Sequence, residues 1–173
     1  MATIRDLTSL VPPPEQPQKQ WNWDRIESNL GFIVPDDYRQ IVDTHGRGKF
    51  DNFLRVFTPD DLGQQIQIKR DALRMAANSQ ELFGVQPTET PYPIEALTVC
   101  AYTDNGDDIY WSSDSSSDPN TWRIVVHATR DEEWDAFDGP LIEFLVAVFS
   151  GSYVCPIFPD DFPGSAVSRF VSQ

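Results

Sequence analysis

Positive charge is scarce in this chain. Of its 173 residues, 13 are Lys or Arg and 27 are Asp or Glu, which leaves a formal net charge of −14 at pH 7. Nucleic acids and anionic membrane surfaces carry the same sign of charge, so this balance argues against both as direct partners. It favours a basic partner, or simply high solubility.

Cysteine and long apolar runs are scarce as well. The two cysteines, Cys100 and Cys155, fit no zinc or redox spacing. The longest apolar stretch, residues 141–149, is far too short to span a bilayer. No charged segment followed by an apolar run opens the sequence, as a secretory signal would. We therefore expect a reduced, cytoplasmic protein.

Familiar catalytic patterns are missing. His45 lies on the apolar stripe of a predicted helix, and His127 lies within a predicted strand with no second ligand at a metal spacing. Residues 104–108 do not match a calcium loop, and the Ser-rich residues 112–118 lack the context of a nucleophile elbow. Residues 46–49 lack the frame of a phosphate loop. We expect no catalytic residue, no metal ligand and no cofactor.

The chain divides into three parts by composition. Residues 1–20 contain "VPPPEQPQKQ", with four prolines in ten residues, which is typical of an extended, unpaired arm. Removal of residues 1–18 is therefore expected to leave stability nearly unchanged. Residues 21–151 form the predicted domain, and residues 152–173 form a phenylalanine-bearing tail that we expect to pack on it.

Helical spacing and strand-forming residues predict a single α+β domain with packed helices. Helices are predicted over about residues 22–31, 35–46, 58–77 and 140–150, and strands over residues 49–57, 94–104, 107–114 and 121–130.

The stretch "YTDNGDDIYW", residues 102–111, predicts a hairpin. Asn105-Gly106 is the strongest short signal for a two-residue type I′ turn. That turn would place Asp104 directly across from Asp107, which destabilises a strand pair by roughly 0.2–1 kcal/mol. Either Asp104 accepts a hydrogen bond from its own turn, or a cationic group relieves the repulsion in the working complex.

Acidic and aromatic residues alternate around this hairpin. Residues 95–140 hold eleven acidic residues against two arginines, a net of −9. Charge speeds encounter with a basic protein, and desolvated aromatic residues supply binding energy. The alternative is that the acids form a solvated rim and the aromatic residues are core, as we expect for Trp111, Trp122 and Trp134. The residues predicted to face a partner are Asp104, Asp107, Asp108 and Asp114, with Tyr110 as the exposed aromatic anchor.

Three segments, taken in order, resemble the SUKH superfamily, which groups fungal cell-wall-assembly regulators with many bacterial immunity proteins. The segments are "WDRIESNLGFIVPDDYRQIVDTHGRG", "YTDNGDDIYW" and "WDAFDGPLIEFLVAVFSG". The resemblance covers residues 21–151. One departure is Cys100-Ala101, where family members often carry Trp-Gly. The matching positions are Trp23, Glu27, Leu30, Gly31, Pro35, Asp37, Tyr38, Gly46, Thr103, Asp104, Asn105, Gly106, Asp107, Trp111, Phe144, Leu145 and Gly151.

The resemblance implies a mainly antiparallel sheet with packed helices and a binding function without catalysis. It implies an immunity protein that neutralises a cognate toxin, often a nuclease, by binding it. A regulatory or scaffold module in cell-wall or signalling control is the first alternative. A metal-dependent hydrolase using Asp104, Asp107 and Asp108 is the second. The sequence leaves the toxin and the oligomeric state open.

Overall fold

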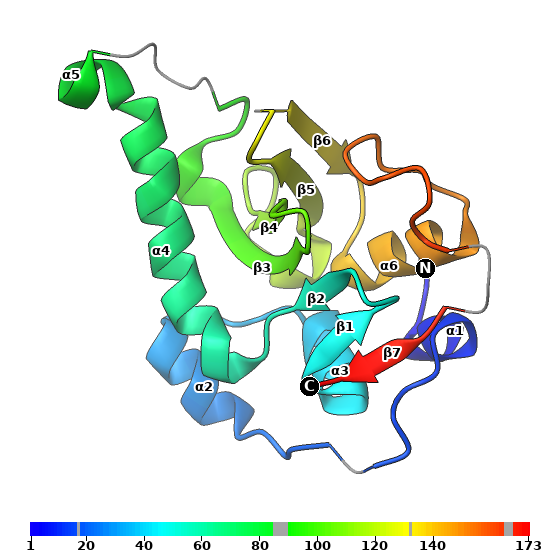
Figure 1. Cartoon of the computed structure of the whole chain (residues 1–173). Helices are drawn as coiled ribbons and strands as arrows, with labels where there is room; N and C mark the ends of the chain where they lie inside the picture. The colour runs from blue at the N-terminus through cyan, green and yellow to red at the C-terminus, as the bar shows by residue number, and fades with distance from the viewer. Residues whose placement is uncertain (17, 85–89, 132, 165–167) are drawn as a thin grey trace.

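The computed structural model of the chain describes residues 1–173 except residues 17, 85–89, 132 and 165–167. It confirms the predicted fold class, because helices pack on an antiparallel seven-stranded sheet (Figure 1). The helices are α1 (Ile4–Leu10), α2 (Trp23–Leu30), α3 (Asp36–His45), α4 (Pro59–Ala77), α5 (Ser79–Phe83) and α6 (Leu141–Ser150), with short 3₁₀ turns η1 (Ile94–Ala96) and η2 (Pro119–Thr121). The strands are β1 (Gly48–Phe50), β2 (Leu54–Val56), β3 (Leu97–Thr103), β4 (Asp108–Ser112), β5 (Arg123–Ala128), β6 (Glu133–Phe137) and β7 (Phe170–Ser172).

The sheet is a meander with one addition. Its strand order is β6-β5-β4-β3-β2-β1-β7, so β1 to β6 lie beside their neighbours in sequence and β7 returns to pair with β1. In a meander, alternate connections lie at the same end of the sheet. The β1–β2, β3–β4 and β5–β6 turns therefore share one end, which we call the hairpin-tip end. Within the described residues, no helix is both long enough and apolar enough to traverse a bilayer.

Capping residues explain the helix ends that were predicted correctly. The Asn22 side chain accepts a hydrogen bond from the Arg25 N–H at 3.1 Å and so caps α2. Gly31 ends the same helix at φ 79°, in the left-handed conformation that suits glycine. Helix α3 begins after Pro35, which makes no side-chain cap, and ends at His45, followed by Gly46 at φ 70°.

The expectation that residues 1–20 are an extended, unpaired arm and that the folded part begins at residue 21 is wrong. Residues 4–10 form α1, which opens with a capping box between Thr3 and Asp6. Leu7 and Val11 are fully buried, and α1 packs against α6 and α3. The prolines begin only after this helix. The structure of residues 1–11 therefore follows from their apolar spacing and not from the composition of the whole segment.

The predicted single strand over residues 49–57 is also wrong, because the chain turns back in its middle. Asp51 and Asn52 have φ values of 49° and 54°, and the Phe53 N–H bonds to the Phe50 carbonyl at 3.1 Å. Two consecutive residues with positive φ between antiparallel strands are the signature of a type I′ turn, which Asp and Asn tolerate. The segment is the β1–β2 hairpin.

The β3–β4 turn differs from its prediction by one residue. Thr103 pairs with Asp107, and the Gly106 N–H bonds to the Thr103 carbonyl at 3.0 Å. The connection is thus a three-residue loop in which Gly106 has φ 90° and Asn105 has an ordinary negative φ. Asp104 does not face Asp107, so the predicted like-charge pair is absent. A bulge between Val99 and Ala101 shifts the register again further along β3.

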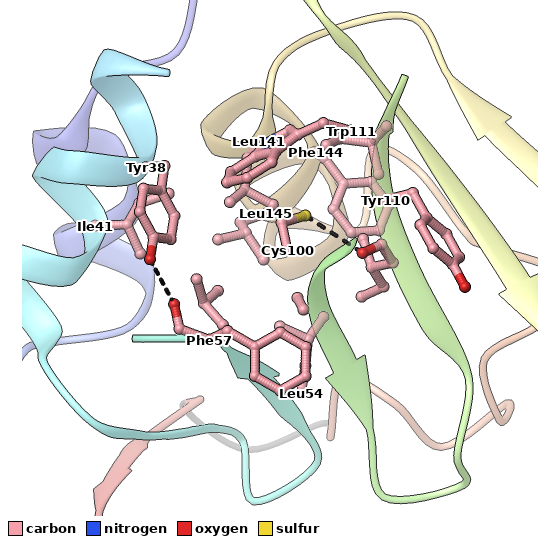
Figure 2. Close-up of a cluster of buried hydrophobic side chains, with 14 of the residues drawn as sticks. Tyr38, Ile41, Leu54, Phe57, Cys100, Tyr110, Trp111, Leu141, Phe144 and Leu145 are labelled. Atoms are coloured by element: carbon pink, nitrogen blue, oxygen red, sulfur yellow. Dashed lines mark hydrogen bonds between the residues drawn. The ribbon is translucent and has the colours of Figure 1, made fainter. Parts of the chain in front are cut away.

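The two faces of the sheet have different coverings. Helices α1, α3 and α6 lie over one face, the apolar face, and α4 runs along the other, the α4 face (Figure 1). Trp111 points into the apolar core beside Leu141 and Phe144, whereas Tyr110, its neighbour in β4, points to the other side (Figure 2). Trp111 and Tyr38 meet edge to face at 5.1 Å, and Tyr38 donates a hydrogen bond to the Phe57 carbonyl at 2.8 Å.

The tail adds to the core beyond residue 151. Phe158 is buried, and both Phe158 and Phe162 pack against Phe53 at the β1–β2 turn. Asp51 accepts a hydrogen bond from the Gly164 N–H at 2.8 Å. These contacts hold residues 156–164 beside the hairpin-tip end.

Candidate functional site

The five residues predicted to face a partner do not share one surface. Asp107, Asp108 and Tyr110 are 6%, 3% and 2% exposed, so the prediction that they are accessible is wrong. The start of β4 is buried on both faces of the sheet. Asp107 and Asp108 are consecutive in an extended strand and so point to opposite faces of the sheet.

Asp107 closes the β3–β4 hairpin on the apolar face. The Thr103 hydroxyl donates to its carboxylate at 2.6 Å, and its own N–H donates to the Thr103 Oγ1 at 3.2 Å. These paired hydrogen bonds offset the cost of burying the carboxylate. Its first role is therefore to fix the turn.

Asp104 and Asp114 lie at opposite ends of β4 and are held by different cations. The Asp104 side chain is 41% exposed and forms an ion pair with Lys49 at 2.7 Å. Asp114 forms an ion pair with Arg123 and accepts a hydrogen bond from the Ser112 hydroxyl at 2.9 Å. Partial desolvation raises the pKa of Asp114, but the bonds from Ser112 and Arg123 outweigh it and hold this pKa below its ordinary value.

Asp108 is the centre of a polar cluster on the α4 face. Lys69, from α4, lies 2.8 Å from its Oδ1, and the Tyr110 hydroxyl donates to its Oδ2 at 3.2 Å. Burial raises the pKa of Asp108, and the Lys69 ammonium opposes that shift. Burial and the neighbouring Asp108 carboxylate raise the pKa of Tyr110.

This cluster belongs to a row of polar and aromatic side chains that crosses five strands. Paired positions place its members side by side, and His127 stacks on Trp134 with ring centroids 3.9 Å apart. Sequence reasoning missed this row because each member is isolated within its own strand, and only the pairing of the strands brings them together. The row is Arg55, Tyr102, Asp108, His127 and Trp134.

Two pockets open between α4 and this row, and Lys69 lines both. The first, which we call the Asp108 pocket, has a volume of about 320 Å³ and is lined by Lys69, Ala72, Leu73, Ala76, Asp108, Tyr110, His127 and Thr129. The second, the Arg55 pocket, has a volume of about 290 Å³ and is lined by Arg47, Arg55, Phe57, Asp61, Gln65, Lys69 and Tyr102.

A third pocket, the acidic pocket, lies at the hairpin-tip end. The Thr129 hydroxyl donates to the Gly106 carbonyl at 2.8 Å and so holds the β3–β4 and β5–β6 turns together. Between these turns and the tail lies a pocket of about 280 Å³. Its lining includes carboxylates from both turns and two apolar tail residues: Asn105, Asp107, Ala128, Arg130, Asp131, Glu133, Pro156 and Ile157.

The three carboxylates predicted for a metal-dependent hydrolase do not converge on one point. Asp104 binds Lys49, Asp107 binds Thr103 and Asp108 binds Lys69, each in a different direction. Across the part of the chain that the structure describes, no three His, Cys, Asp or Glu side chains are grouped as metal ligands.

His45 is part of the core. Its Nε2 lies 3.0 Å from the Val11 carbonyl oxygen, and burial lowers its pKa, which favours the neutral ring. This contact ties α3 to the end of α1.

Neither the known family models nor the curated protein sequences contain a match to this chain. The site is therefore interpreted from its own geometry and chemistry.

Proposed function

We propose that this chain is a non-catalytic binding module that holds a basic partner protein at its hairpin-tip end. The observation that carries the proposal is the acidic pocket, which lies between two turns and the tail. The resemblance to the SUKH superfamily implies that the partner is a toxin domain of nuclease type and that the chain is its immunity protein.

The charge around the pocket supports a cationic partner. Asp131 and Glu133 are exposed on the β5–β6 turn, and Asp104 is exposed on the β3–β4 turn but paired with Lys49. Arg130 is the one cation among the described residues that line the pocket. The tail adds Asp160 and Asp161 beside the β1–β2 turn. Such a concentration of one sign speeds encounter with a partner of the opposite sign.

The lining of the pocket suits a long cationic side chain. Lys and Arg have an apolar stem that packs on apolar surface and a charged head that binds polar groups or water. Pro156 and Ile157 offer apolar surface for the stem, and Asp131 and Glu133 offer carboxylates for the head. Arg is favoured among such partner residues because its planar fork binds a carboxylate through two hydrogen bonds.

The experiment identifies the partner by pull-down and then measures binding kinetics at two ionic strengths. The test variant is Asp104→Asn/Asp131→Asn/Glu133→Gln. The matched control is Glu15→Gln/Asp71→Asn/Glu81→Gln, which removes three exposed charges elsewhere. We expect the test variant to associate at least tenfold more slowly at low salt, with a flatter salt dependence, and the control to associate like the wild type.

Two outcomes would reject this proposal. Equal slowing of both variants would show that net charge, and not the hairpin-tip end, guides association. An unchanged rate in the test variant would remove the acidic pocket from the interface. A partner without toxin activity, and no toxin gene beside this one, would favour the regulatory or scaffold module instead.

A further inference from the structure

The Arg55 pocket reverses the charge balance of the chain. Acids outnumber bases 27 to 13 in the whole sequence. In this pocket, however, three cations, Arg47, Arg55 and Lys69, line the wall with one carboxylate, Asp61. In so acidic a protein, such a local excess of cations requires an explanation.

Arg55 is the member whose charge is not balanced by the protein. Its side chain is half-buried, and its Nε is buried without a hydrogen-bond partner. Among the described residues no carboxylate forms an ion pair with it, and its guanidinium lies instead 5.6 Å from the ring centroid of Tyr102. A buried donor without an acceptor destabilises the fold, and more so when it is charged.

The other two cations are already paired, but both face the same pocket. Arg47 lies 3.2 Å from Asp61, and Lys69 lies 2.8 Å from Asp108. Three cations against these two carboxylates leave one positive charge in excess. One monoanionic group would neutralise it.

We propose that the Arg55 pocket binds a small oxyanion, a phosphate or a carboxylate, with the Arg55 guanidinium as its main ligand. The planar fork of arginine matches both groups through paired hydrogen bonds. The Gln65 amide and the two paired cations add donors around the same space. Tyr102 and Phe57, stacked at 5.0 Å, form an aromatic wall that keeps the guanidinium partly out of water and so strengthens its bond to an anion.

The size of the pocket restricts the ligand to a small molecule. Its volume of about 290 Å³ is close to the lower end of the range for small-molecule sites. The pocket shares no lining residue with the acidic pocket. The proposal therefore stands apart from the proposed function, and the failure of one leaves the other untouched.

Calorimetric titration tests the proposal with three probes: inorganic phosphate, phenyl phosphate and benzoate. Ionic strength is fixed near 0.1 M, where the field of distant charges is screened beyond about 10 Å. We expect at least one probe to bind with millimolar or better affinity, and Arg55→Gln to weaken that binding at least tenfold. Binding of both phosphates but not benzoate assigns the pocket to phosphate, and binding of benzoate alone assigns it to carboxylate.

Arg70→Gln is the matched control. Arg70 is also half-buried with an unpartnered Nε and forms no ion pair among the described residues, but it does not line the Arg55 pocket. It should bind the probe like the wild type. Arg47→Gln changes an exposed residue that lines the pocket, and it should weaken binding several-fold even if Arg55→Gln does not fold.

Three results would overturn the proposal. The first is that no probe binds at 10 mM. The second is that Arg55→Gln, shown to be folded by its melting curve, binds like the wild type. The third is that Arg55→Gln and Arg70→Gln lose the same affinity, which would mean that only net charge matters. If Arg55→Gln is unfolded, unchanged binding by Arg47→Gln overturns it.

Discussion

The two faces of the sheet are built from the same strands but from different chemistry. On the apolar face, Val56, Ala101, Ile109 and Val126 form a paired row beneath three helices. One residue further along each strand, the row on the α4 face is polar or aromatic throughout and lies beneath a single helix. The first row keeps water out, whereas the second row borders two pockets.

The difference between the two rows distinguishes residues that stabilise the fold from residues that the fold tolerates. Burial of apolar surface stabilises a domain, and burial of a polar group costs free energy unless the group is paired. A sequence selected only to fold would place apolar residues on both faces, and real proteins depart from this rule mainly at functional sites. The α4 face is therefore where small-molecule chemistry is to be sought, and the hairpin-tip end is where a protein partner is to be sought.

The largest expected effect comes from the apolar face. Leu7→Ala should lower the free energy of unfolding by about 2–5 kcal/mol, because it removes a fully buried side chain and leaves a cavity. Chemical denaturation measures the change. The control is Met75→Ala on α4, where the side chain is 53% exposed and the loss should stay within about 0.5 kcal/mol. Equal small losses in both variants would mean that α1 does not belong to the core.

The next effect tests the pairing on the α4 face. Lys69→Met removes the cation that balances Asp108, and it should cost about 2 kcal/mol because the carboxylate stays buried. The double variant Lys69→Met/Asp108→Asn should recover most of this loss, since it removes the unpaired charge as well. Denaturation of the wild type, of the single variants Lys69→Met and Asp108→Asn, and of the double variant completes a double-mutant cycle. A single variant as stable as the wild type would show that the ion pair contributes nothing.

The pH dependence of stability is a smaller test of the same residue. Burial raises the pKa of Asp108 above its ordinary value of 3.8, so between these two pKa values the folded state holds a proton that the unfolded state has lost. The contribution of Asp108 is therefore fully present below pH 3.8 and is lost as pH rises through the folded pKa. Relative to Asp108→Asn, the wild type should gain stability as pH falls from 6 to 4. Asp37, whose pKa burial also raises, is present in both proteins and cancels in the difference.

The helices could be predicted from sequence because their signals are local. Apolar spacing and a capping residue at each end determine α2 and α3 within a few residues of the chain. Helix α1 has the same spacing in Ile4, Leu7 and Val11. The prolines that follow it, however, favour an extended arm when the composition of residues 1–20 is taken as a whole. The pattern of residues 4–11, and not the composition of the surrounding 20, determines the helix.

The site could not be predicted in the same way because it depends on pairing between distant strands. A shift of one residue in the β3–β4 turn changes which residues of β3 lie beside Asp107 and Asp108. The contacts of Lys69 with Asp108 and of Arg55 with Tyr102 join segments that lie far apart in sequence. No periodicity within a single segment contains that information.

The smallest expected effect decides this register and with it the pairing of β3 with β4. Gly106 has φ 90°, and a Cβ added there would meet only the Thr129 hydroxyl, at 3.8 Å, so Gly106→Ala should cost about 1 kcal/mol through backbone strain alone. Asn105 has an ordinary φ, so Asn105→Ala should change the free energy of unfolding by less than about 0.5 kcal/mol. A two-residue type I′ turn requires positive φ at both positions and predicts similar losses for the two variants. Similar losses would therefore place Asp107 across from Asp104 and Asp108 across from Thr103, and the row on the α4 face would have to be redrawn.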